Sequence, residues 1–182
     1  MLAAEDLSMV AINNLRRLLL PFFCLAMPGQ IFAEWEPPAK PDPDAILEEA
    51  RTDVRARRYE DALAKHLWFH RHALEYRKSL YGVRLSFALS NWHQLGKEYP
   101  TAMVELKKVR DQARKRVVSA KKDIREPFHD MSSINKYLGD QKQTANVFIR
   151  LDKNSPKLAA TVYGIAEPDL IEEKNTKCAA NI

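Results

Sequence analysis

Three segments of this 182-residue chain begin with the same arrangement of side chains, and this recurrence limits the folds available to it. Each segment carries core-forming residues at offsets of 3, 7 and 10 from its first position, which is the spacing of one helix face. The first positions are Tyr59, Tyr99 and Gln141, so the units lie 40 and 42 residues apart. A unit of that length holds two helices with a small apolar face that only neighbours can bury. The pattern predicts stacked helical hairpins, and a single bundle with a repeating core is the alternative.

Helical periodicity extends through most of the chain after residue 43. It is clearest between residues 80 and 97, where apolar side chains recur at spacings of 4, 3, 4 and 3. No segment shows the strict alternation and turn dipeptides of paired strands. We therefore predict an all-α fold. The helices expected in chain order are 45–57, 59–77, 80–97, 101–127, 128–138, 141–151 and 156–164.

The repeated starts resemble the second-helix pattern of the tetratricopeptide-repeat family, in which an aromatic residue precedes a small and then a large apolar one. In the third unit the separation of Gly139 and Pro156 also resembles that of the family's turn glycine and closing proline. The resemblance covers about 110 residues, and its period is longer than the 34 residues of that family. It implies a short α-solenoid of antiparallel hairpins, whose first helices line a concave surface that binds another protein.

The same resemblance implies which side chains face the concave surface. Cations and one amide dominate this set, so the implied partner is a protein segment or acidic extended peptide held by charge-assisted hydrogen bonds. Phe87 would add an apolar contact. The implied groove residues are Leu47, Arg51, Arg55, Arg84, Phe87, Asn91, His129, Ser133 and Lys136.

Residues 1–33 have the three parts of a secretory signal peptide. Two arginines precede the apolar run 18–27, and small or tolerated residues precede a cleavage point near Ala33. About ten apolar residues are too few to cross a bilayer, which argues against the alternative of a membrane anchor. We therefore expect export to the periplasm or the extracellular space. Initiation at Met9 rather than Met1 gives the segment a more regular basic start.

The rest of the chain divides by composition. Residues 34–43 form a proline-rich spacer, because four prolines remove backbone donors and prevent a helix. We expect one helical repeat domain at 44–173 and a disordered tail at 174–182. The only cysteine after the signal peptide is Cys178, so the processed chain forms no internal disulfide. That thiol is either free or paired with another chain.

Basic residues exceed acidic ones by 29 to 24, which gives a net charge of +5 and a modest attraction to anionic partners. Much of the basic character falls in the predicted helix 101–126. This helix lacks aromatic residues that stack on bases, and the expected export also argues against a nucleic-acid partner. The alternative function is therefore an accessory protein that binds an anionic surface of lipid headgroups, polysaccharide or another polyanion. Its candidate residues are Lys107, Lys108, Arg110, Arg114, Lys115 and Arg116.

Residues with catalytic or metal-binding chemistry are few. His66 and His70 lie one helical turn apart, but no glutamate general base stands between them, so structural roles are favoured over a metal site. The sequence contains no Gly-rich phosphate loop or nucleophile elbow. We expect no enzymatic activity, no metal site and no cofactor. The leading functional hypothesis is an exported, non-enzymatic adaptor or scaffold.

Overall fold

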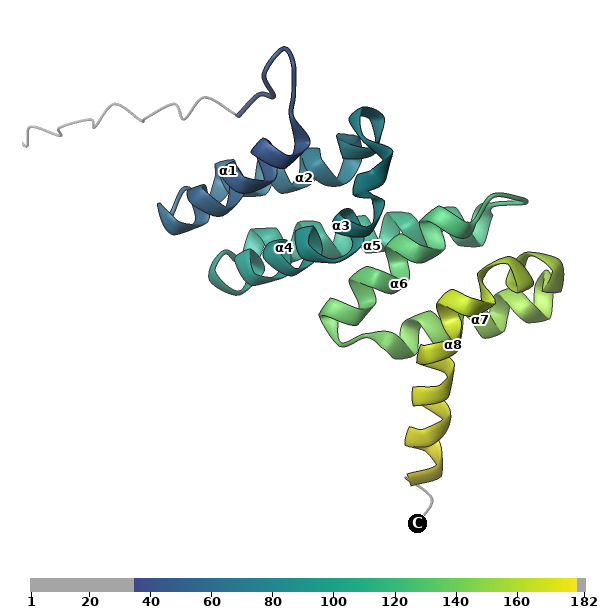
Figure 1. Ribbon diagram of the computed structural model, residues 1–182. Helices are drawn as coiled ribbons and strands as arrows, with labels where there is room; N and C mark the ends of the chain where they lie inside the picture. Colours follow the sequence, from purple (N-terminus) through teal and green to yellow (C-terminus); the bar gives the residue numbers. More distant parts are fainter. Residues whose placement is uncertain (1–34, 180–182) are drawn as a thin grey trace, which may run out of the picture. The chain divides into compact units, whose positions relative to one another are not determined.

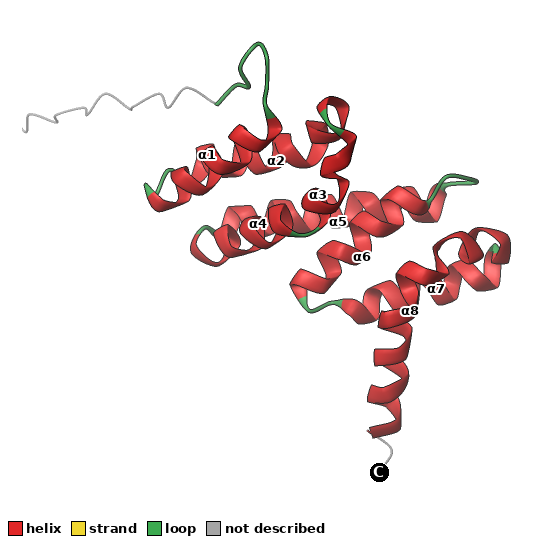
Figure 2. Ribbon diagram, in the orientation of Figure 1, coloured by secondary structure: helices red, strands yellow, loops and turns green. Residues whose placement is uncertain are grey.

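The computed structural model describes residues 35–179, with side chains as far as residue 174, and the regular elements in this range are helices (Figures 1 and 2). The predicted all-α class is confirmed for this part of the chain. The predicted signal peptide at 1–33 lies outside the described residues. In chain order the elements are α1 (Pro43–Arg55), α2 (Tyr59–Tyr76), the 3₁₀ helix η1 (Lys78–Leu80), α3 (Tyr81–Leu85), α4 (Phe87–Glu98), α5 (Pro100–Ser119), α6 (Arg125–Leu138), α7 (Gln141–Asn154) and α8 (Pro156–Ala179).

The three repeated starts are confirmed as helix starts. Helix α2 begins at Tyr59, α5 begins at Pro100 directly after Tyr99, and α7 begins at Gln141. The residues at offsets 3 and 7 are buried in each of these helices, as the shared pattern predicts. They are Ala62, His66, Ala102, Leu106, Thr144 and Phe148.

Helix α1 begins at Pro43, where Asp42 and Pro43 together form the start of the helix. The Asp42 carboxylate accepts a hydrogen bond from the backbone N–H of Asp44 at 3.1 Å. Pro43 occupies the first helical position, where an N–H has no partner within the helix. The first helix is therefore fixed at its N-terminal end.

Helices that follow one another along the chain pack against each other. Contacts join α1 to α2, α4 to α5, α5 to α6, and α7 to α8, and Figure 1 shows the same succession. The rings of Tyr59 and Tyr99 stack with their centroids 5.9 Å apart, and the Tyr59 hydroxyl donates a hydrogen bond to Glu98 at 2.9 Å. The beginnings of α2 and α5 therefore lie side by side.

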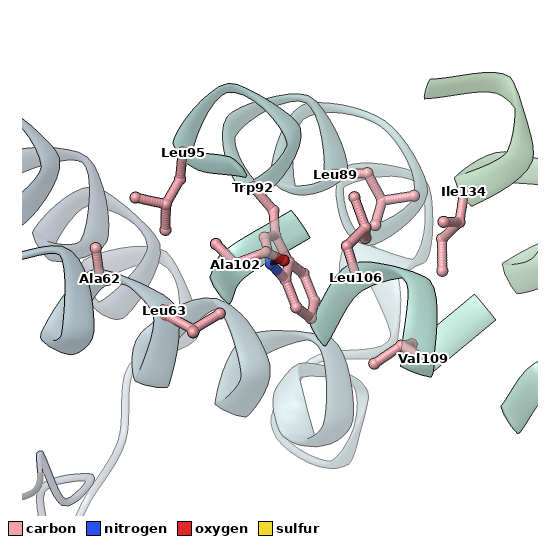
Figure 3. Close-up of a cluster of buried hydrophobic side chains, with 9 residues drawn as sticks. All are labelled: Ala62, Leu63, Leu89, Trp92, Leu95, Ala102, Leu106, Val109 and Ile134. Atoms are coloured by element: carbon pink, nitrogen blue, oxygen red, sulfur yellow. Dashed lines mark hydrogen bonds between the residues drawn. The ribbon is translucent and has the colours of Figure 1, made fainter. Parts of the chain in front are cut away.

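One buried cluster surrounds Trp92 and joins α2, α4, α5 and α6 (Figure 3). The indole N–H of Trp92 donates to the Ala102 carbonyl at 3.0 Å, so this polar group is buried with a partner. The His66 ring stacks on the indole at 6.1 Å between centroids, and the His70 ring meets it edge-on at 6.0 Å. We call this cluster the Trp92 core, and its buried apolar members are Ala62, Leu63, Leu89, Trp92, Leu95, Ala102, Leu106, Val109 and Ile134.

A second buried cluster surrounds Phe128 and joins α5 to α8. Its members on α8 lie in the first half of that helix, which is where α8 packs against α7 and α6. The cluster is apolar throughout, so burial of hydrocarbon surface is what holds these helices together. We call it the Phe128 core, and its buried members are Ala113, Val117, Ile124, Phe128, Met131, Phe148, Ala159, Val162 and Ala166.

The predicted helix 80–97 is interrupted at Ser86, which separates α3 from α4. The backbone of Ser86 leaves the helical region, with φ of −125° and ψ of −91°. Its carbonyl accepts a hydrogen bond from the Tyr137 hydroxyl of α6 at 2.9 Å. The apolar periodicity continues across the break, since Leu85 and Ala88 are both buried, so the pattern gave no sign of it.

The predicted helix 101–127 is also wrong, because two helices and a turn occupy this range. Helix α5 ends at Ser119, and α6 begins at Arg125. Between them Asp123 has a φ of +54°, in the left-handed region, which a right-handed helix cannot continue through. Pro127 is the third residue of α6, where its missing N–H removes no helical hydrogen bond. This proline therefore belongs to the start of a helix and not to the end of one.

The two ends of the described range differ from expectation. Helix α8 continues to Ala179, whereas we predicted a last helix at 156–164 and a disordered tail from residue 174. The helix continues because no glycine or proline follows Pro168. At the other end, residues 35–42 of the spacer have no regular structure, but Trp35 contacts Trp68 of α2 with ring centroids 6.4 Å apart. The spacer is therefore attached to α2 by an aromatic contact.

Candidate functional site

A groove of about 290 Å³ lies between α1 and α4. These are the first helices of two predicted hairpins. Four of the residues that the family resemblance implied for a partner-binding surface line it, and we call it the α1–α4 groove. The lining residues are Asp44, Leu47, Glu48, Arg51, Val83, Phe87 and Asn91.

Two side chains give the α1–α4 groove its recognition chemistry. Phe87 is 72% exposed, although it is a large aromatic side chain, and it is the first residue of α4 after the break at Ser86. Asn91 lies one helical turn further along and is half-buried. Its amide offers both donors and an acceptor, which matches the backbone of an extended peptide. One helix therefore offers an apolar contact and a side chain that can hydrogen-bond to a peptide backbone.

The charges in the α1–α4 groove are paired within the chain. The Arg51 guanidinium donates to the Glu48 carboxylate at 2.7 Å. The Asp44 carboxylate accepts from Arg77, which follows α2. The groove lining therefore carries two carboxylates and one guanidinium, and it is not the predominantly cationic surface that the sequence implied.

Arg84 lies elsewhere, in a buried polar network between α2, α3 and α6, and it does not line the α1–α4 groove. Its side chain is 4% exposed, and its Nη2 donates to the Asp130 carboxylate at 2.5 Å. Its Nη1 donates to the Nε2 atom of His70 at 3.2 Å and to the His70 carbonyl at 3.3 Å. Burial raises the pKa of Asp130, and the Arg84 charge opposes that rise. Sequence reasoning missed this network because Asp130 lies 46 residues from Arg84 along the chain.

The remaining implied groove residues are dispersed. Arg55 is exposed at the end of α1 and does not line the groove. On α6, His129 is hydrogen-bonded to the Tyr81 hydroxyl at 3.0 Å, and burial lowers the pKa of its imidazole. Ser133 is half-buried and Lys136 is exposed on the same helix. The structure therefore brings Leu47 and Arg51 of α1 together with Phe87 and Asn91 of α4, and it leaves Arg55 and the candidates on α6 apart.

The six cations proposed for the anionic-surface alternative have different environments. Arg110 is buried, and it donates to Asp111 at 2.9 Å and to Asp140 at 2.9 Å. Lys108 is paired with Glu105 at 2.6 Å. The other four are exposed and form no ion pair in the part of the chain that the structure describes; they are Lys107, Arg114, Lys115 and Arg116.

A second cavity, of about 300 Å³, lies between α5 and α7. Apolar side chains line much of it, including Val117, Val118 and Leu151, and Val118 is 72% exposed. Two exposed arginines, Arg114 and Arg150, also line it. We call it the α5–α7 pocket. Arg150 was not identified from the sequence, because the order of residues along the chain does not pair α5 with α7.

The two histidines considered for a metal site are buried against Trp92. Burial lowers the pKa of His66 to about 4. Burial, together with the neighbouring Arg84 and Arg71 charges, lowers the pKa of His70 to about 3. Both imidazoles are therefore neutral at physiological pH. Within the described residues there is no group of three or more His, Cys, Asp or Glu placed to hold a metal ion.

Comparisons with protein-family models, with curated protein sequences and with solved structures found no match. In the described residues none of the helices has the length and apolar character needed to span a membrane.

Proposed function

We propose that this protein is an exported, non-enzymatic adaptor that binds an extended segment of another protein in the α1–α4 groove. The observation that carries the proposal is Phe87, which is 72% exposed in a groove beside a half-buried Asn91. An exposed aromatic side chain can contact an apolar side chain of the partner, and the amide beside it can hydrogen-bond to the partner's backbone. The α5–α7 pocket is lined by an exposed aliphatic residue, Val118, and its lining includes no aromatic side chain.

The arrangement of the hairpins supports a tetratricopeptide-like stack. Helices α2 and α5 begin at equivalent positions of the repeat, and Tyr59 and Tyr99 stack at those positions. Their partners, α1 and α4, contact each other and line the groove. In a stack of this kind the first helices form the binding face. Export follows from the signal-peptide pattern at residues 1–33 and places the partner outside the cytosol.

The partner segment that we propose has an apolar rather than an acidic anchor. Arg51 is already paired with Glu48, and Asp44 adds a further negative charge to the groove lining. An acidic peptide would have to displace Glu48 and approach Asp44. An aliphatic or aromatic side chain against Phe87 and Val83 meets neither obstacle.

Site-specific crosslinking tests the adaptor proposal. A photoreactive phenylalanine derivative at position 87 should capture one partner in cells that make the protein, at both low and high salt. The matched control is the same derivative at position 149, because Ile149 is also an exposed apolar residue, 50% exposed, but lies on α7. Asn91→Ala should lower the capture by about tenfold. Equal capture from positions 87 and 149, or heterogeneous capture that salt abolishes, would contradict the proposal.

A second candidate function is binding to an anionic lipid surface, and the α5–α7 pocket favours it. Exposed Val118 can enter the headgroup region while Arg114 and Arg150 meet lipid phosphates. Each basic residue near an anionic membrane contributes about 1 kcal/mol, so Arg114→Gln with Arg150→Gln should weaken binding to phosphatidylglycerol vesicles roughly thirtyfold. Sedimentation with these vesicles and with neutral vesicles measures the difference. Equal binding to both kinds of vesicle would exclude this function.

A further inference from the structure

The buried network around Arg84 adjoins a cavity that the adaptor function does not use. This cavity has a volume of about 220 Å³ and lies where α2, α3, α5 and α6 meet. Its volume is below the roughly 300–1,000 Å³ of pockets for drug-sized ligands, so only a small molecule fits it. We call it the Arg84 pocket, and its charged and imidazole lining groups are His70, Arg71, Arg84, Arg116, Glu126 and Asp130.

The hydrogen bond from Arg84 fixes the proton position on His70. A guanidinium has donors only, so the Nη1 of Arg84 donates and the Nε2 of His70 accepts, at 3.2 Å. The neutral imidazole therefore carries its proton on Nδ1. That Nδ1–H group is buried and has no hydrogen-bond partner. His70 thus presents an unsatisfied donor next to the pocket.

Arg84 supplies a second donor of the same kind. Its two terminal nitrogens are engaged with Asp130 and His70, but its Nε–H is buried without a partner. Buried polar groups in folded proteins are nearly always hydrogen-bonded. His70 and Arg84 both line the cavity, and the Nδ1–H of His70 points away from Arg84, so each donor needs an acceptor of its own.

The charges around the Arg84 pocket favour a negatively charged acceptor. The Asp130 carboxylate is already paired with Arg84. Of the other charged lining groups, Arg71 and Arg116 are positive and Glu126 is negative, which leaves one excess positive charge. Arg71 and Arg116 are exposed and form no ion pair within the described residues, so they can contact a ligand as it enters.

We propose that the Arg84 pocket binds a small free oxyanion of the phosphate or carboxylate type. One of its oxygens accepts a hydrogen bond from the Nδ1–H of His70, and Arg116 balances its charge at the entrance. This site is separate from the α1–α4 groove, which is lined by different residues. Failure of the adaptor proposal therefore leaves this proposal intact, and the reverse also holds.

Calorimetric titration of the purified protein with inorganic phosphate, and separately with acetate, tests the site at constant ionic strength set by chloride. At least one anion should bind saturably. Arg116→Gln should weaken that binding about tenfold, as expected for loss of one charge-assisted hydrogen bond. Glu126→Gln should strengthen it, because a nearby negative charge is removed. The matched control is Lys122→Gln, which removes one exposed positive charge after α5 and does not line the pocket.

A nuclear magnetic resonance measurement locates the bound anion. Binding should shift the Nδ1–H proton of His70 and slow its exchange with water, and this signal should remain unchanged when chloride alone is added. The proposal is overturned if neither anion binds saturably, or if Lys122→Gln weakens binding as much as Arg116→Gln. Binding of an acidic peptide without binding of either free anion also overturns it, because the acceptor would then be a side chain of a partner.

Discussion

The Trp92 core and the Phe128 core bury side chains of different chemistry. Two neutral imidazoles, His66 and His70, contact the indole of Trp92, and His70 continues into the buried ion pair of Arg84 with Asp130. The buried cluster around Phe128 consists of apolar residues alone. Hydrocarbon burial is insensitive to proton concentration, whereas a buried imidazole must remain neutral for the fold to persist. Acidification should therefore destabilise the Trp92 core through its two imidazoles, whereas none of the members of the Phe128 core titrates.

The largest effect should come from breaking the ion pair beside the Trp92 core. Arg84→Ala leaves the Asp130 carboxylate buried without its partner, which should cost about 3–5 kcal/mol in the free energy of unfolding. Urea denaturation measures this loss. The matched control is Arg51→Ala, whose ion pair with Glu48 is about half exposed and should contribute at most about 1 kcal/mol. Similar losses in the two variants would show that the Arg84 network is not buried as described.

Acidification should distinguish the two cores next. The folded pKa of His66 is about 4, below the ordinary value of 6.5, so between these values the unfolded chain binds a proton that the folded chain does not. The stability from neutral His66 is therefore complete above pH 6.5 and falls as the pH decreases toward 4, by roughly 3 kcal/mol. His66→Phe should remove this part of the pH dependence. Denaturation midpoints at pH 7 and pH 4.5 provide the measurement.

Two controls accompany the acidification experiment. His72→Gln is the matched histidine substitution, because this histidine lies at the surface, where it contacts Glu75. Met131→Ala in the Phe128 core should lose about 2–5 kcal/mol through the cavity that it creates, by the same amount at both pH values. If the His66→Phe variant keeps the full pH dependence of stability, groups other than His66 cause it.

The smallest effect should come from a turn that belongs to neither core. Gly139 ends α6 with a φ of +70°, which a residue with a Cβ atom adopts at a cost of about 1–2 kcal/mol. No atom lies within 4 Å of a Cβ added there, so Gly139→Ala changes the backbone energy alone. Its loss should be the same at pH 7 and pH 4.5 in thermal denaturation. A markedly larger loss would show that side-chain packing also depends on this turn.

The helical class and the repeated helix starts could be predicted because both depend on local patterns. The core positions Ala62, Leu106 and Phe148 follow from spacing along one helix face, which the sequence displays directly. The break at Ser86 could not be predicted, because the apolar spacing continues across it and its stabilising contact comes from Tyr137 on another helix. Pro127 was misplaced because a proline is compatible with the first turn of a helix as well as with the residue after its end.

The candidate site was predictable in part for the same reason. Phe87 and Asn91 lie one turn apart on a single helix, so their shared surface follows from helical geometry. Arg84 lies one turn earlier in the sequence and looks equivalent to them. Only the fold places Asp130, 46 residues away, against Arg84 and so converts a candidate surface cation into a buried one. Long-range charge pairing is the information that a local pattern does not contain.

The environment of Lys65 has a consequence for chemical labelling. Its side chain is 8% exposed, and its ammonium group is paired with Asp53 of α1, which Arg58 also contacts. Because the amine is accessible only when α1 separates from α2, its rate of acylation should follow the frequency of that opening and not the global unfolding of the chain. Exposed lysines of α5 should react without any such opening. The acylation rate of Lys65 therefore measures how often the α1–α2 hairpin opens.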